Sequence, residues 1–345
     1  MRHHSQPPLR PARLALHPLL TLGFVLLLLL ALCAASPARA QDSHLLVVSG
    51  LSGEPRFAAD FEKWTGQLRA AAERSGVSAA NVVAFSERGE GALRATRANV
   101  LAALQALAGR AGEADEILIV LFGHGSESAG EARLNLSGPD LTARELAAAL
   151  QVVRARRIAV VNTTSASGAF LKPLAGPNRI VITATKSGAE QNETLFPRFF
   201  VAGLTGAAAD TDKDGRVSLF EAFEYGRQET ERAYSSTRRL QTEHPLLEAD
   251  GDGVGSPAPK VGEGDGAAAS LAFLGGRVPG AAGAAASPEL RSLEAEKRRI
   301  ESALEELRRQ RAQLPDAEYQ RRLEQLLLEL SRNGQAIRRL TGGDS

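Results

Sequence analysis

Residues 116–122 read EILIVLF, an apolar run that decides the fold. A strand with one face in water alternates apolar and polar side chains, whereas a strand covered on both faces is apolar throughout. The run therefore predicts a strand that is buried between two helical layers. Its neighbours are expected to be the other apolar runs, at residues 44–49, 81–86, 157–162 and 179–185.

Helical patterns alternate with these predicted strands. Residues 56–74, 96–109 and 141–153 carry apolar side chains at helical spacing. Strands that alternate with helices are typical of an α/β fold, in which a mostly parallel sheet has helices on both faces. We assign residues 41–253 to this α/β domain.

The first 40 residues have the layout of a secretory signal peptide. Arginines precede an apolar run from Leu19 to Leu32, and Ala38 and Ala40 supply the small side chains expected before a cleavage point. The run is shorter than the roughly 18 residues that a membrane span needs, although a retained anchor is the alternative. We predict cleavage after Ala40, a periplasmic or secreted protein, and no membrane contact by the mature chain.

Charge and cysteine content narrow the possible partners. The chain has 41 Lys and Arg against 40 Asp and Glu, and four of the basic residues precede residue 41. The mature chain therefore has 37 basic residues and a net charge of −3, which gives no reason to expect a nucleic-acid partner. The only cysteine, Cys33, leaves with the signal peptide, so the mature chain has neither a thiol nor a disulfide.

The composition changes twice in the C-terminal quarter of the chain. Residues 254–287 are mostly Gly, Ala, Ser and Pro, which predicts a flexible linker. Residues 288–345 carry two series of apolar residues at heptad spacing, which predict a helical hairpin or coiled coil. Lys297 and Arg311 stand in the apolar seam, so we expect self-association or a partner helix. A solitary helical tail is the alternative.

Candidate catalytic residues follow two of the predicted strands. The sequence FGHGS occupies residues 122–126, and NTTSASG occupies residues 162–168. In an open parallel sheet, ligands and catalytic groups gather at the carboxyl ends of the strands. We therefore expect His124 and Ser165 to lie close together.

These two motifs resemble those of the legumain/caspase-like peptidases (clan CD). In that family one strand ends in His-Gly, and a later strand ends in a catalytic cysteine that is followed by x-Ser-Gly. The resemblance covers roughly residues 44–235. It implies that His124 and Gly125 form the histidine motif and that Ser165 stands where the catalytic cysteine would be. It also implies a cleft at the sheet end for a peptide or protein, beside the loop of Glu190 and Glu193.

The serine is a departure from the family. A cysteine thiol has a pKa of about 8.5 and is partly ionised near neutral pH, whereas a hydroxyl needs a hydrogen-bonded base. We therefore expect most peptidase activity to be lost. An active hydrolase with Ser165 as nucleophile and His124 as base is the alternative. Thr163, Thr164 and Ser167 are further hydroxyls without an evident base, and all four hydroxyls could instead cap the following helix.

Residues 210–221, DTDKDGRVSLFE, have the spacing of an EF-hand calcium loop between the helical segments 195–204 and 219–234. Gly215 would allow the sharp turn. The predicted ligands are Asp210, Asp212, Asp214, the carbonyl of Arg216, Ser218 and Glu221. We predict a structural Ca²⁺, and an acidic turn that binds nothing is the alternative. The stretch 248–253, EADGDG, is only half of such a loop. It could supply Asp250 and Asp252 to the same ion, but a solvated turn is the simpler interpretation.

Together these features predict an exported, catalytically silent member of the resembled family that acts as a calcium-braced binding or scaffolding protein. The active serine hydrolase is one competing hypothesis. In a third, residues 288–345 are the working part and the sheet domain is their carrier.

Overall fold

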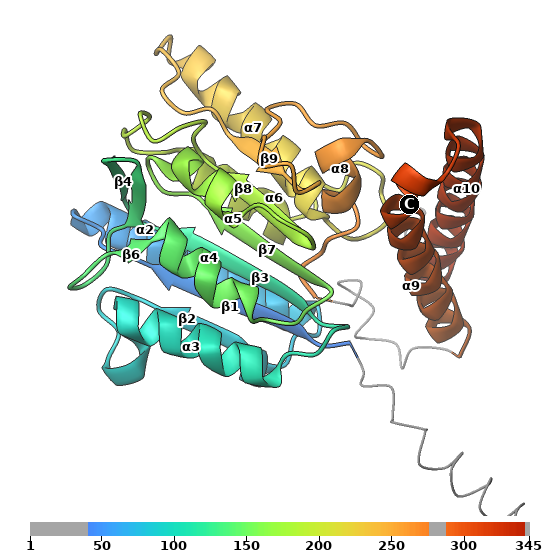
Figure 1. Cartoon of the computed structure of the whole chain (residues 1–345), viewed down its shortest axis with the longest axis horizontal. Coiled ribbons are helices and arrows are strands. Elements are labelled where there is room, and N and C mark those ends of the chain that lie inside the picture. The colour runs from blue at the N-terminus through green and yellow to red at the C-terminus, as the bar shows by residue number, and fades with distance from the viewer. Residues whose placement is uncertain (1–40, 276–287, 342–345) are drawn as a thin grey trace, which may run out of the picture. The chain divides into compact units, whose positions relative to one another are not determined.

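The computed structural model describes residues 41–275 and 288–341, apart from some side chains of the second range (Figure 1). The predicted signal peptide and residues 276–287 of the predicted linker lie outside the described residues. From Gln41 onward the chain forms one compact unit.

A six-stranded sheet organises this unit, in the order β2-β1-β3-β7-β8-β9 (Figure 1). Its strands are β1 (Ser43–Ser49), β2 (Val82–Phe85), β3 (Glu116–Phe122), β7 (Arg157–Asn162), β8 (Arg179–Thr183) and β9 (Leu246–Glu248). The first five are parallel, and β9 runs antiparallel to β8. The predicted α/β fold with a mostly parallel sheet is confirmed. Strand β9 was not predicted.

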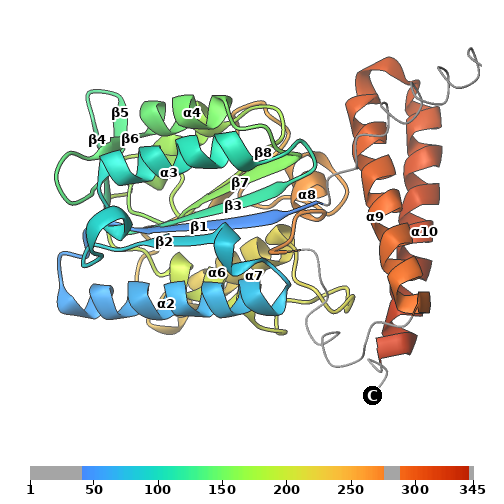
Figure 2. The same cartoon turned by 90° about the horizontal axis from the view of Figure 1, so that it is seen from below.

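Helices cover both faces of the sheet (Figure 2). One face carries α2 (Pro55–Arg74), α6 (Phe196–Thr205) and α7 (Leu219–Ser236), and the other carries α3 (Arg97–Arg110), α4 (Ala143–Gln151) and α5 (Leu171–Leu174). Along β3, Leu118 and Val120 join the first core, while Ile119 and Leu121 join the second. Both faces of the strand are buried, which is why its sequence is apolar throughout.

A small antiparallel sheet follows His124. It consists of β4 (Gly125–Ser128), β5 (Glu131–Leu134) and β6 (Leu141–Thr142). Sequence patterns did not predict these strands, because strands of two to four residues are too short to show a period. Thr142 then caps α4 in a capping box with Glu145.

The folded domain extends beyond the predicted boundary at residue 253. Ser256 forms a β-bridge with Leu247, and residues Gly264–Ala269 form helix α8. Ala269 is fully buried and Leu274 is 7% exposed, so residues 254–275 belong to the packed domain rather than to a flexible linker. Alanine-rich composition suits a linker, but it also suits close packing of a short helix, and tertiary contacts decide between the two.

The C-terminal segment forms two helices, α9 (Pro288–Arg309) and α10 (Asp316–Thr341), joined by a short 3₁₀ turn. Asn333 on α10 donates a hydrogen bond to the carbonyl of Leu293 on α9. Ile300, Leu304 and Ile337 are buried. Within the two described ranges, no helix has the length and apolar character needed to span a membrane.

Candidate functional site

Strands β3 and β7 position the two predicted catalytic motifs. They are parallel neighbours, and their register pairs Val120 with Val161 and Leu121 with Asn162. The segments that follow the two strands therefore leave the same edge of the sheet. This places the turn after β7 beside the His-Gly pair after β3, so that Ser165 and Gly125 meet.

Ser165 is held by the backbone of Gly125. Its Oγ accepts a hydrogen bond from the Gly125 N–H at 3.1 Å and donates one to the Gly125 carbonyl at 3.1 Å. The side chain is only 3% exposed. A Cβ on Gly125 would lie 2.4 Å from the Ser165 carbonyl oxygen, so this contact requires a glycine. The Ser165 hydroxyl therefore ties the end of β7 to the start of β4.

His124 makes a different contact. Its Nε2 lies 3.1 Å from the carbonyl oxygen of Ser52, and its ring packs edge-on against Phe57 with the ring centroids 5.5 Å apart. A general base must reach the hydroxyl that it deprotonates. Within the described part of the chain, no hydrogen bond joins His124 to Ser165, so the two side chains lie in one region without forming a dyad.

The other hydroxyls of the turn are also bonded within the fold. Thr163 Oγ1 donates to the Leu121 carbonyl, and Thr164 Oγ1 donates to Asn162 Oδ1. Ser167 Oγ accepts from the N–H groups of Ala184 and Thr185, at 3.0 and 3.1 Å.

These contacts correct the alternative in which the hydroxyls cap the following helix. The residue at the cap position of the next helical turn (Ser167–Phe170) is Ala166, and no side-chain cap bond forms there. Three of the hydroxyls instead bond to neighbouring strands or the segments that follow them, namely those of Thr163, Ser165 and Ser167, and the Thr164 hydroxyl bonds locally to Asn162. Asn162 is an exception beside the turn, because its Nδ2 is buried without a partner.

The loop after β8 locks this turn in place. The carbonyl of Glu190 accepts a 2.7 Å hydrogen bond from Ala166, whose backbone is left-handed with φ +54°. The Glu190 carboxylate pairs with His244 and with Lys186. Glu193 is paired with Arg56 at an exposed position. Sequence reasoning singled out Glu190 but missed His244, which is 54 residues away and carries no local signal.

A hollow of about 590 Å³ opens at the carboxyl ends of β1 and β2. Its lining includes Ser52, Phe61, Thr65 and Glu87. Ser52 donates through its Oγ and its N–H to the Glu87 carboxylate, and its carbonyl oxygen contacts His124. The hollow thus lies next to the histidine motif, and its volume is in the range of small-ligand and peptide side-chain pockets.

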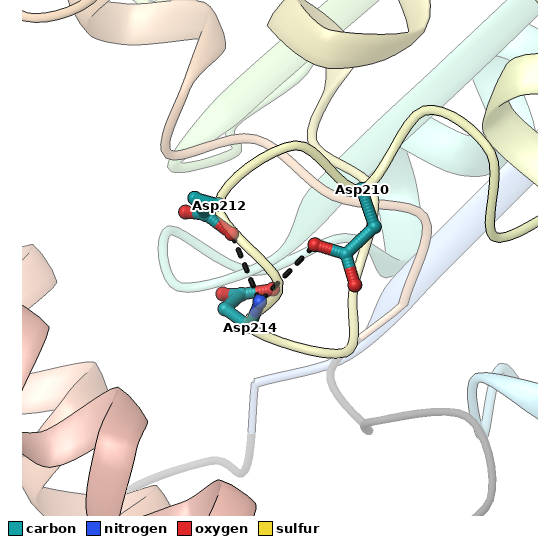
Figure 3. A group of neighbouring side chains, drawn as sticks. All are labelled: Asp210, Asp212 and Asp214. Atoms are coloured by element: carbon teal, nitrogen blue, oxygen red, sulfur yellow. Dashed lines mark hydrogen bonds between the residues drawn. The ribbon is translucent and has the colours of Figure 1, made fainter. Parts of the chain in front are cut away.

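Three of the predicted calcium ligands converge. The carboxylates of Asp210, Asp212 and Asp214 each offer an oxygen within 4.8 Å of the others (Figure 3). Asp210 and Asp212 both accept the N–H of Asp214, at 3.1 and 3.0 Å, and Asp210 also accepts the N–H of Gly215. Burial, together with the nearby carboxylates of Asp214 and Glu221, raises the pKa of Asp212 to about 6. Such crowded carboxylates fit a hard divalent cation.

The remaining predicted ligands are engaged elsewhere. Glu221 forms a capping box with Ser218 at the start of α7, and its other oxygen accepts the N–H of Thr211. The guanidinium of Arg216 stacks on Phe273, 3.6 Å from the ring centroid, so only its carbonyl could serve an ion.

Lys297 on α9 forms an ion pair with Asp214. The structure therefore brings three aspartates together and leaves Glu221 beside them in a capping role. A bound cation would compete with Lys297 for Asp214 and with the capping bonds for Glu221.

No model of a known protein family matches this chain, and no curated protein matches it either.

Proposed function

We propose that this protein is an exported, catalytically silent relative of the legumain/caspase-like peptidases that binds a protein or peptide at its sheet end. The observation that carries the proposal is the environment of Ser165, whose Oγ both donates to and accepts from the backbone of Gly125. A serine hydroxyl needs a hydrogen-bonded base to become a nucleophile, and both hydrogen bonds of the Ser165 hydroxyl go to Gly125. The candidate base, His124, contacts the Ser52 carbonyl instead.

The proposed partner site is the hollow beside Ser52 and Glu87. It contains the apolar side chain of Phe61 and a balanced set of charges. Glu62 and Glu87 stand with Arg69 and Arg88 in its lining, which suits an extended peptide that carries both polar and apolar side chains. The family resemblance supports the same edge of the sheet, because peptidases of this type bind peptides there. Periplasmic or secreted location follows from the predicted signal peptide and is part of the proposal.

A peptide-cleavage assay tests the silent site. The mature chain is incubated with a broad peptide library beside Ser165→Ala, His124→Ala and the exposed control Ser235→Ala. We expect no turnover by any of the four proteins. Turnover in the wild type and the control that is lost in both the Ser165 and His124 variants would establish the hydrolase alternative. Cleavage gained by Ser165→Cys would show that the peptide site persists without its nucleophile.

Calcium bracing of residues 210–221 is the second part of the proposal. Its support is the convergence of three aspartates and the raised pKa of Asp212, since a bound cation would relieve the repulsion among them. Ca²⁺ at ten times its Kd should stabilise the protein by about 1.4 kcal/mol. We expect Asp212→Asn to reduce this gain and Asp60→Asn, exposed on α2, to preserve it. An equal gain in all three proteins would place the ion elsewhere.

The C-terminal helices are proposed to associate with a second copy of the chain as an α-helical hairpin. The heptad pattern and three exposed leucines on α10 support this, since Leu327, Leu328 and Leu340 are 41, 51 and 43% exposed. Light scattering on Leu328→Lys should show a smaller species than the wild type, while Gln325→Lys, exposed on the same helix, should leave the size unchanged. A monomeric wild type would refute the association.

A further inference from the structure

A second acidic turn follows strand β9 and repeats the backbone pattern of residues 210–214. Glu248, Asp250 and Asp252 have the same spacing as Asp210, Asp212 and Asp214, and each series is followed by a glycine with positive φ. Asp250 Oδ1 accepts the N–H of Asp252, and Asp252 Oδ1 accepts the N–H of Val254. Oxygens of the three carboxylates lie within 4.8 Å of one another.

Glu248 sets this turn apart from an ordinary acidic turn. Its side chain is fully buried, and its Oε1 accepts the N–H groups of Gly251 and Gly253 at 2.6 and 3.4 Å. Its Oε2 is buried and has no hydrogen-bond partner. A buried carboxylate oxygen is costly unless it is bonded or bound to a cation. The carboxylate that carries this unpartnered oxygen belongs to the same cluster as the carboxylates of Asp250 and Asp252.

Between described residues, no ion pair includes Glu248, Asp250, Asp252 or the adjacent Asp265, and Asp250 lines a hollow that it shares with Arg156, Arg157 and Arg179. Asp265 adds a fourth negative charge and accepts the N–H groups of Ala249 and Asp250. These bonds hold the turn in shape without supplying a positive charge.

We infer that Glu248, Asp250 and Asp252 form a second divalent-cation site, distinct from residues 210–221 and best suited to Ca²⁺. Calcium prefers several oxygen ligands in flexible geometry, and three carboxylates with water completing the shell meet that preference. Glu248 would supply the buried carboxylate ligand, while Asp250 and Asp252 would supply the ligands on the solvent side. Strand β9 is antiparallel to β8 and pairs Glu248 with Val181, so it runs toward the amino end of β8. The site therefore lies at the opposite end of the parallel strands from Ser165.

Equilibrium dialysis of the mature chain against Ca²⁺ tests the site. The variant is Glu248→Gln, which keeps the shape and an acceptor for Gly251 but removes the charge. We expect it to bind one Ca²⁺ fewer per chain than the wild type at free Ca²⁺ up to about 1 mM, the range of extracellular sites. Asp252→Asn, at an exposed position, should weaken the same site at least tenfold. Glu263→Gln, exposed on the following segment, should bind as the wild type does.

The test of this second site is independent of the proposed calcium site at residues 210–221. Loss of one equivalent in Glu248→Gln supports the second site whatever Asp212→Asn does. Unchanged stoichiometry and affinity in both Glu248→Gln and Asp252→Asn would overturn it. Thermal unfolding gives an independent sign: Glu248→Gln should melt higher than the wild type in EDTA and gain less from Ca²⁺. An equal advantage with and without Ca²⁺ would contradict cation binding by Glu248.

Discussion

The turn after β7 and the turn after β9 both gather polar side chains at an end of the sheet, but they use them differently. In the first turn, the hydroxyls of Thr163, Thr164, Ser165 and Ser167 all have partners within the protein. In the second turn, Glu248 keeps one buried oxygen without a partner. Polar groups that satisfy one another build structure, whereas an unsatisfied buried carboxylate that lies beside two further carboxylates suits a cation.

The largest effect is expected from Gly168, which lies in the 3₁₀ segment Ser167–Phe170 at the end of the turn after β7. A Cβ there would stand 2.2 Å from the Ser187 nitrogen and 2.3 Å from the Lys186 carbonyl carbon, and neither backbone atom can move freely. We expect Gly168→Ala to cost about 4 kcal/mol or to prevent folding. Urea unfolding measures the loss.

Gly66→Ala on α2 is the matched control, because a Cβ there meets nothing within 4 Å. It should raise the free energy of unfolding by up to about 1 kcal/mol, as alanine does in a helix interior. A Gly168→Ala protein as stable as the wild type would mean that the turn is loose and able to rearrange for catalysis.

Ser167 tests whether a single hydroxyl of the turn after β7 stabilises the fold. Its removal leaves the N–H of Thr185 without its acceptor in a fully buried place, while the N–H of Ala184 keeps the Asn162 carbonyl at 3.0 Å. An unsatisfied buried N–H costs about 1–3 kcal/mol, so Ser167→Ala should lower the free energy of unfolding by about 1–3 kcal/mol. The exposed Ser235→Ala should change it little. If both variants unfold alike, the Ser167 hydroxyl is not structural.

Glu243 provides a third case, a buried carboxylate that is bonded but not charge-paired. It accepts the N–H groups of Leu195 and Phe196 at the start of α6 and the hydroxyl of Tyr234. Burial raises its pKa to about 7, because desolvation outweighs these bonds and the Glu190 carboxylate adds repulsion. The folded state thus holds its proton more tightly than the unfolded chain does.

The raised pKa of Glu243 decides whether the free energy of unfolding rises or falls with pH. Stability from Glu243 is greatest below pH 4.5 and is lost as the pH rises toward about 7, by an amount on the order of 1–3 kcal/mol. Urea unfolding in EDTA should show this fall in the wild type and a flatter profile in Glu243→Gln. Glu231→Gln, exposed on α7, should follow the wild type. Ca²⁺ should not alter the difference that Glu243→Gln makes, in contrast to Glu248→Gln.

Sequence patterns predicted the central sheet because both faces of β3 are buried and its residues are uniformly apolar. They also predicted that the His-Gly pair and the Ser165 turn share one edge. Hydrogen bonding at that edge could not be predicted, since whether Ser165 meets His124 or the Gly125 backbone depends on side-chain direction. Strand β9 and residues 254–275 escaped prediction because short strands and alanine-rich segments carry no distinct period.

The two acidic turns show the same limit. Spacing identified residues 210–221 as an EF-hand-like loop, yet Glu221 caps α7 and Lys297 pairs with Asp214. The half-loop at residues 248–253 was expected to be a solvated turn, and Glu248 proves to be fully buried. Burial of that glutamate depends on the packing of β9 against β8, which no local motif encodes.

Reaction with a fluorophosphonate tests most directly whether the turn after β7 is structural. This reagent phosphonylates a serine hydroxyl that a base has activated, and intact mass spectrometry of the mature chain detects the adduct. With its Oγ bonded to Gly125, Ser165 should stay unmodified in the wild type and in His124→Ala, so that both give the adduct-free spectrum expected of Ser165→Ala. A stoichiometric adduct at Ser165 that disappears in His124→Ala would contradict the account.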